Sequence, residues 1–170
     1  TQHGRRKHCR VGVWQSDPSI CYKPDQEPCP PMTHLSRQHL DLRQLLHGQR
    51  VAALGSLNAD GTPMVSMVPY AIDRQTPCLV IHVSSLAAHT GNMLRHSAVS
   101  LLVMRPEMPG EPVHALPRAT LHGHAQAPTP ESPQWHQARD AYLARFPEAA
   151  PMMELGDFRL VRIPVDQIRQ

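Results

Sequence analysis

Short apolar segments separated by turn residues restrict the fold of this chain more than any other feature. Residues 51–57 and 64–72 flank the turn Asn58-Ala59-Asp60-Gly61, whose glycine suits a tight hairpin. Further strand-like segments follow at residues 78–84, 98–104, 113–127 and 158–163. Six strands joined mostly as hairpins, with few helices between them, predict a mainly β protein, a six-stranded antiparallel barrel with peripheral helices.

The remaining periodic segments predict helices around this barrel. Apolar residues at helical spacing indicate one helix over residues 34–47, before the first strand. A second helix is expected over 86–95 with Ser85 as its N-cap, and a third from the Thr129–Pro133 region to about Phe146. Pro63 and Pro69 lack the N–H that a central strand donates, so their strand is expected at an edge or with a bulge.

Residues 1–31 differ in composition from the rest of the chain. They are basic and rich in proline, and they contain both lysines and three of the four cysteines. They hold no apolar stretch of the kind that a secretory signal requires, and their cysteines show no CxxC spacing typical of zinc sites. We therefore predict a disordered or non-native leader over 1–31 and one folded domain over 32–170.

The charge of residues 32–170 excludes several classes of function. Twelve arginines stand against eleven acidic residues, and there is no lysine. This balance makes no basic face for nucleic acid, and the missing lysine excludes a P-loop and a Schiff base. No apolar run reaches the roughly 18 residues of a membrane span. We expect a cytoplasmic protein that acts on a small molecule and binds neither nucleic acid nor membrane.

Residues 82–93 carry the clearest chemical signal, because a buried strand leads there through hydroxyl residues into a helix start. Free N–H groups and the helix dipole favour a phosphate at such a place, and Ser84 and Ser85 would add donors. Helical spacing puts Ser85, His89, Asn92 and His96 on one polar stripe. The alternative for the same residues is an ordinary serine N-cap on a surface helix.

A second candidate is the strand that begins at Arg118. Extended backbone places Arg118, Thr120, His122 and His124 on one face, from which the guanidinium could contact a phosphate, a hydroxyl or an aromatic ring. The alternative is an exposed strand face without a ligand. No metal site is expected there, because no carboxylate or cysteine is placed beside the two histidines.

A third candidate is residues 66–70, where Ser66, Val68 and Tyr70 share a face. Pro69 frees a neighbouring carbonyl from the strand ladder, so that a flat ring could lie against this strand with backbone groups at its edge. An amphipathic strand with an edge proline is the alternative. No motif of nucleophilic or metal hydrolysis appears, and no catalytic residue is identified.

Together these segments resemble the pyridoxamine 5′-phosphate oxidase-like family of FMN-binding split barrels. The most specific match is Ser-x-Leu-Ala-x-His-Thr-x-Asn over residues 84–92. Weaker matches lie at residues 51–57, 60–63, 65–70, 99–103, 118–125 and 155–160. The most similar branch is that of haem-utilisation and general stress flavoproteins. The C-terminal Arg/His motif of true pyridoxamine phosphate oxidases is not recognisable, so that reaction is not expected.

The resemblance implies a homodimer with FMN in the crevices between two chains. It implies that the helix start surrounds the phosphate, that residues 66–69 run along the flavin ring and that Arg118 reaches the ribityl–phosphate part. The residues assigned to the cofactor are Ser66, Met67, Val68, Pro69, His82, Ser84, Ser85, His89, Thr90, Asn92 and Arg118. The interface could include Met64, Met67, Met93 and Met104, which could equally be core residues.

The implied activity is oxidation or reduction of an unidentified small molecule, with the chemistry carried by FMN. Two other interpretations stay open. One is a haem-binding or haem-utilisation protein on the same fold. The other is a non-catalytic dimeric module without the cofactor, since Ala87 and Ala88 stand where the family carries positive residues.

Overall fold

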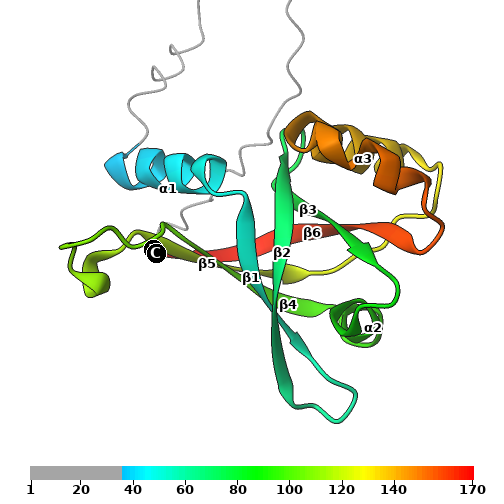
Figure 1. Cartoon of the computed structure of the whole chain (residues 1–170), viewed down its shortest axis with the longest axis horizontal. Helices are drawn as coiled ribbons and strands as arrows, with labels where there is room; N and C mark the ends of the chain where they lie inside the picture. Colours follow the sequence, from blue (N-terminus) through cyan, green and yellow to red (C-terminus); the bar gives the residue numbers. More distant parts are fainter. Residues whose placement is uncertain (1–35) are drawn as a thin grey trace, which may run out of the picture. The chain divides into compact units, whose positions relative to one another are not determined.

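The computed structural model describes residues 36–170 (Figure 1), and the prediction about residues 1–31 lies outside this part. The helices and strands in chain order are α1 (Arg37–Gly48), β1 (Val51–Leu57), β2 (Pro63–Asp73), β3 (Cys78–Ser84), α2 (Ala88–Arg95), β4 (Ala98–Met104), β5 (Arg118–His124), α3 (Pro133–Arg145) and β6 (Phe158–Arg169). Short 3₁₀ segments at Val113–Ala115 and Pro147–Glu154 precede β5 and β6. No helix within residues 36–170 has the length and apolarity to cross a membrane.

The six strands are antiparallel and close into a barrel, as the sequence predicted. Their order around the barrel is β1-β2-β3-β6-β5-β4. Strand β2 changes partner along its length. Its first part, residues 63–69, pairs with β1, and its last part, residues 70–73, pairs with β3. Pro63 and Pro69 both lie in the first part, where β2 pairs with β1 on one edge only. The other edge makes no strand hydrogen bonds there, so a residue without an N–H is tolerated.

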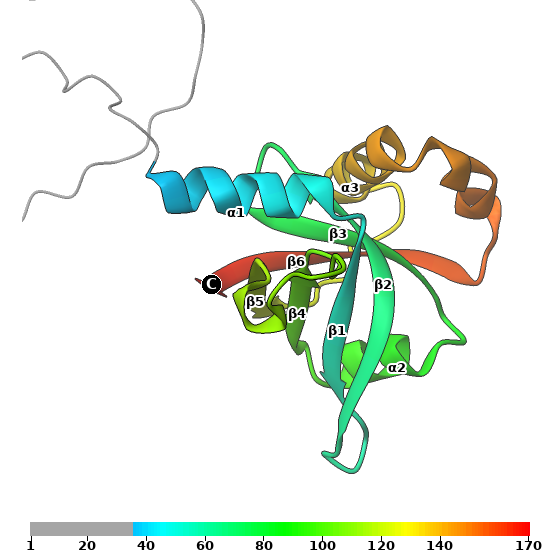
Figure 2. The same ribbon diagram turned by 60° about the vertical axis from the view of Figure 1, so that its left-hand side comes forward.

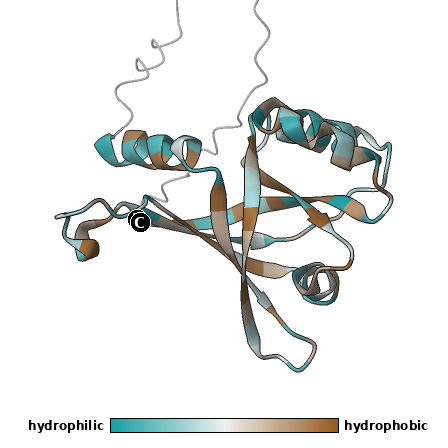
Figure 3. Cartoon of the chain, viewed as in Figure 1, coloured by the Kyte–Doolittle hydropathy of each residue, from teal (hydrophilic) through white to brown (hydrophobic). Residues whose placement is uncertain are grey.

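The barrel interior is filled by alternate residues of all six strands. Its fully buried side chains include Leu54, Tyr70, Ile81, Leu101 and Ile163. Hydrophobic residues recur along these strands, whereas hydrophilic residues cover much of α1 and α3 (Figure 3). Helices α1 and α2 lie at opposite ends of the barrel (Figures 1 and 2) and contribute Leu45 and Met93 to the same core.

A second apolar cluster lies outside the barrel, under α3. Val80 and Leu160 from the outer face of β3 and β6 pack against Tyr142 and Phe146 of α3 and its C-cap. This cluster explains why β3 is buried on both faces, from Cys78 to Val83. It also covers the outer side of the strand that leads into the candidate phosphate site.

The structure corrects three boundaries of the sequence analysis. Helix α2 begins at Ala88 with Ala87 as N-cap, so the prediction that Ser85 caps it was wrong. The predicted strand over 113–127 is shorter, because Val113–Ala115 forms a 3₁₀ turn before β5. Strand β6 continues to Arg169, because its first half pairs with β3 and its second half with β5.

Candidate functional site

The turn between β3 and α2, residues 84–87, is held against β6 by side chains as well as by backbone. Strand register places Val83 opposite Arg159, and the Nε–H of Arg159 donates to the hydroxyl oxygen of Ser85 at 3.0 Å. Because Ser85 accepts this bond, its own O–H remains free to donate. Within residues 36–170 the terminal nitrogens of Arg159 have no other partner. The turn therefore presents one hydroxyl and one cationic donor group.

The first turn of α2 adds donors to this place. Ala87 provides no side-chain cap, so the N–H groups of Ala88 and His89 have no acceptor inside the helix. The Nε2 atom of His89 is buried and has no partner among the described residues. Burial lowers the pKa of His89, because the charged ring would lose its hydration. The free N–H groups of the helix start, together with the Ser85 hydroxyl and Arg159, suit an oxyanion.

Ser84 differs from Ser85, because its hydroxyl is already used. It donates to the carboxylate of Asp157 at 3.2 Å and accepts the N–H of Leu86 at 3.1 Å. Ser84 therefore fixes the shape of the turn. Asp157 places a negative charge on the β6 side of the turn, and Arg159 places a positive charge two residues further along β6.

Thr90 and Asn92 of α2 have structural partners. The Thr90 hydroxyl donates to the Ser84 carbonyl oxygen at 2.6 Å, and the Asn92 amide donates to Asn58 Oδ1 at 2.9 Å and to Ser56 at 3.3 Å. Both side chains are at most 2% exposed, and they tie α2 to the β3–α2 turn and to the β1–β2 hairpin. The predicted polar stripe is therefore wrong, because Ser85 lies outside the helix and Asn92 points inward.

The predicted ring-binding strand splits between the two faces of β2. Ser66, Val68 and Tyr70 share a face as predicted, but this face points into the barrel, where the Ser66 hydroxyl is buried without a partner. Met67 and Pro69 lie on the outer face, and Met67 is 66% exposed. Of this segment, only Met67 and Pro69 present side chains to a ligand outside the barrel.

His82 lies under α3, where its ring packs against other aromatic rings. Its ring centroid is 5.0 Å from that of Phe158 and 5.6 Å from that of Tyr142, and its Nδ1 atom is buried without a partner. Burial lowers the pKa of His82, because the charged ring would lose its hydration among apolar neighbours. The structure places His82 in the packing of α3 on β3.

Replacing His82 by leucine is expected to reduce the loss of stability in weak acid. The histidine is neutral in both states above its unfolded pKa of 6.5. Below that pH the unfolded chain takes up a proton that the folded chain resists, so stability falls until the pH reaches the folded pKa. Urea unfolding at pH 7 and pH 5 should show a smaller difference for His82→Leu than for the wild type. The control is the same change at the exposed His96. If both variants lose the same stability between pH 7 and pH 5, the expectation is contradicted.

Arg118 lies at the other end of the barrel from the β3–α2 turn. It opens β5 opposite Met104, whereas α2 precedes the start of β4, and a strand of 7 residues such as β4 covers about 20 Å. The guanidinium donates to the carbonyl oxygens of His114 and Leu116, beside a cavity of about 670 Å³ between α1 and the β4–β5 connection. Within one chain, Arg118 therefore does not join the donors of the turn.

The outer face of β5 is as predicted, with Arg118, Thr120, His122 and His124 on the side away from buried Ala119 and Leu121. The His124 ring pairs with Asp166 at 2.9 Å. Within residues 36–170 no three metal-ligating side chains come together.

The sequence analysis missed Arg159, the one cation among residues 36–170 that contacts the β3–α2 turn. The signal that could have found it is the pairing of β3 with β6, which brings the start of β6 beside the end of β3. Pairing between distant strands does not follow from local periodicity. The helix itself carries only Ala87 and Ala88 where the family has positive residues.

Comparison with known proteins gives the chain a family. Residues 40–170 match the model of the family described as pyridoxamine 5′-phosphate oxidase. The noncanonical heme oxygenase HOZ, a chloroplast protein of Arabidopsis thaliana, is 34% identical over 132 residues, which cover 76% of this chain and 38% of that protein. The chain thus spans well under half of this relative.

Two solved structures share the fold. A heme-binding protein from Mycobacterium smegmatis superposes with a TM-score of 0.67 and 27% identity, over 76% of this chain and 51% of that chain. The heme storage protein HutZ from Vibrio cholerae gives a TM-score of 0.69 and 23% identity, over 76% of this chain and 92% of that chain. Because the family model covers nearly all of the described barrel, the chain belongs to the pyridoxamine 5′-phosphate oxidase family.

Proposed function

We propose that this chain is an FMN-binding flavoprotein that works as a homodimer and oxidises or reduces a small molecule. The observation that carries this proposal is the set of free donors at the β3–α2 turn, in a member of this family. When bound, FMN would supply the electron-transfer chemistry at its ring.

The donors of the turn fit the phosphate end of such a cofactor. Ser85 O–H, the N–H groups of Ala88 and His89, and the outer nitrogens of Arg159 are of the kind that bind oxyanions at helix starts. Arg159 supplies from β6 the positive charge that is missing at Ala87 and Ala88. Asp157 accepts from Ser84 and would limit how closely a phosphate approaches the β6 side of the turn.

The outer face of the barrel supports the proposed dimer. Ala53 of β1 lies between Met67 of β2 and Leu102 of β4, and Val65 continues this apolar face beside Gly55. Val65 is 70% exposed and Met67 is 66% exposed. Contiguous exposed apolar residues of this kind mark surfaces that associate. Of the four methionines considered for the interface, Met67 and Met104 are exposed, Met93 is in the core, and Met64 accepts from Asn92.

A second chain would also bring the separated candidate residues to one cofactor. Arg118 and the β3–α2 turn lie at opposite ends of one barrel, so one cofactor contacts both only if Arg118 comes from the partner subunit. The exposed face of β1, β2 and β4 lies between these two ends and would form the wall of the crevice.

Replacing Arg159 by glutamine tests the phosphate site. A hydrogen bond to a charged group contributes about 1.5–3 kcal/mol, so the dissociation constant for FMN is expected to rise about 10- to 100-fold. The constant is measured by quenching of flavin fluorescence on titration with protein. Arg169→Gln removes the same charge from the exposed end of β6 and should leave the constant unchanged. Equal affinities of the two variants for FMN would count against the site.

Haem binding is the second candidate, and the named relatives favour it, since one is a heme oxygenase and two others bind or store heme. Titration with haemin distinguishes the two candidates. A Soret band that stays with the protein through gel filtration, in protein that releases FMN, would favour haem. Retained FMN and haemin that washes out would exclude this second candidate.

A further inference from the structure

A cleft that the proposed cofactor does not use lies between α1, the β2–β3 turn and α3. It consists of two cavities of about 920 and 370 Å³, which adjoin because His47, Ile72, Asp73, Arg74 and Gln75 line both. Helix α1 is at the opposite end of the barrel from α2, so this cleft is separate from the β3–α2 turn (Figure 2).

The larger cavity carries two free guanidinium groups. Arg43 comes from α1 and Arg74 from the β2–β3 turn, and both are exposed. Within residues 36–170 neither guanidinium takes part in a hydrogen bond or an ion pair. In the part of the chain that the structure describes, Asp73 is the one acidic residue that lines this cavity.

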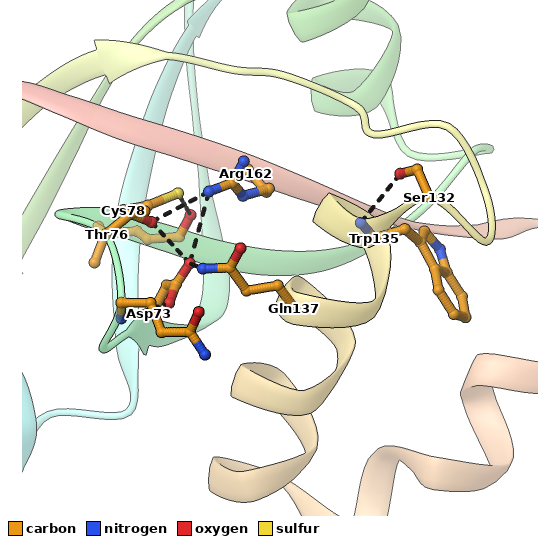
Figure 4. A network of polar contacts seen from close by, with 9 residues as sticks. Asp73, Thr76, Cys78, Ser132, Trp135, Gln137 and Arg162 are labelled. Carbon is orange, nitrogen blue, oxygen red and sulfur yellow. Dashed lines mark hydrogen bonds and ion pairs between the residues drawn. The ribbon is translucent and has the colours of Figure 1, made fainter. Parts of the chain in front are cut away.

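The charge of Asp73 is compensated by its neighbours (Figure 4). Its carboxylate accepts from the Gln75 N–H at 2.9 Å, the Thr76 hydroxyl at 2.8 Å and the Gln137 amide at 2.6 Å, and it pairs with Arg162 at 3.6 Å. These contacts hold the β2–β3 turn, and so the backbone of Arg74, in one position. The wall of the larger cavity is therefore both fixed and positively charged.

Two further charged residues, Arg145 and Asp140, line the smaller cavity. Arg145 donates to the carbonyl oxygens of Leu46, His47 and Gln49, so it compensates the negative end of α1. Asp140 lines the smaller cavity and not the larger one, to which Arg43 belongs. The pKa of His47, which lines both cavities, is lowered by burial and by Arg43, Arg145 and Arg74, so the positive fields converge there.

From this geometry we infer that the cleft is a second ligand site, for a small organic molecule that carries a phosphate group. Arg43 and Arg74 would bind the phosphate oxygens, since the guanidinium geometry matches oxyanions. Leu40, Ile72 and Pro77 line the same cavity and give an apolar wall for the organic part. The volume of each cavity lies in the range of small-molecule pockets.

The experiment is calorimetric titration of the full chain with inorganic pyrophosphate, in low salt and in a buffer without phosphate. The double variant Arg43→Gln, Arg74→Gln is expected to raise the dissociation constant at least tenfold. The control double variant Arg37→Gln, Arg169→Gln removes the same net charge from the start of α1 and the end of β6, outside the cleft. It should change the constant less than twofold. Arg159→Gln is titrated in parallel and reports separately on any pyrophosphate that binds at the β3–α2 turn.

Three results would overturn the inference. Equal weakening in both double variants would mean general attraction to a cationic surface. Weakening in Arg159→Gln alone would mean that pyrophosphate occupies the β3–α2 turn. No binding to the wild type at millimolar pyrophosphate would mean that the cleft is not a phosphate site. Arg43 and Arg74 are exposed, and unchanged circular dichroism of the variants verifies folding. FMN affinity, measured in the same variants, reports separately on the proposed function.

Discussion

Replacing Asp73 by alanine is expected to lower the free energy of unfolding by about 3 kcal/mol or more. The side chain is 2% exposed, and its partner Arg162 is 13% exposed. Removing one member of a buried ion pair leaves the other charge without compensation, which costs about 3–5 kcal/mol. Gln137 and Thr76 lose their acceptor as well, so the β2–β3 turn is released from both α3 and β6.

Urea unfolding at pH 7 measures this effect, with Asp140→Ala as the control. Asp140 is an acidic residue whose side chain is 77% exposed, and its nearest cation is Arg139 at 4.0 Å, so little stability should be lost there. Burial opposes the charge of Asp73, yet hydrogen bonds from Gln75, Thr76 and Gln137 together with Arg162 hold its pKa below the usual value of 3.8. Its contribution is therefore complete above that pH and declines in stronger acid. Equal stability of the two variants would show that the network is not structural.

Replacing Met67 by glutamate is expected to convert the proposed dimer into a monomer of 19.0 kDa. The side chain lies on the outer face of β2, at the centre of the apolar surface that includes Val65 and Ala53. Burying a charge in such an interface without a partner costs several kcal/mol, and every 1.4 kcal/mol raises the dissociation constant of the dimer tenfold. Since Arg118 would then leave the crevice with its subunit, FMN affinity should fall together with dimerisation.

Sedimentation velocity at micromolar concentration compares Met67→Glu with Met108→Glu. Met108 is 58% exposed in the β4–β5 loop and lies outside the apolar face, so its variant should sediment with the wild type. A Met67→Glu protein that sediments like the wild type would contradict the interface on β1, β2 and β4.

The strand positions could be predicted from the sequence, because the pattern of apolar and turn residues within each segment defines them. The bounds of β1, β3 and β4 agree with those expected, since alternating or continuous apolar residues end there at clear turn residues. The first residue of α2 could not be predicted in this way, because contacts with the start of β6 determine where the helix begins. The Ser85 N–H donates to the Asp157 carbonyl and its hydroxyl accepts from Arg159, which holds the turn out of the helix.

The candidate site was predicted in its location more than in its chemistry. The turn of Ser84 and Ser85 does present free donors, but the roles of neighbouring residues depend on contacts that sequence spacing does not show. Asn92 is used by the β1–β2 hairpin, and Arg159 arrives from a strand more than seventy residues away. Hydrogen-bond partners of this kind become known only when the pairing of β3 with β6 is known.

The most direct test of the account is the absorption spectrum of the purified protein after incubation with FMN and gel filtration. We expect flavin bands that elute with the protein at the volume of a dimer, with one FMN per chain, because each dimer would form two equivalent crevices. A colourless protein that elutes as a monomer would contradict the shared cofactor site, and with it the proposed function.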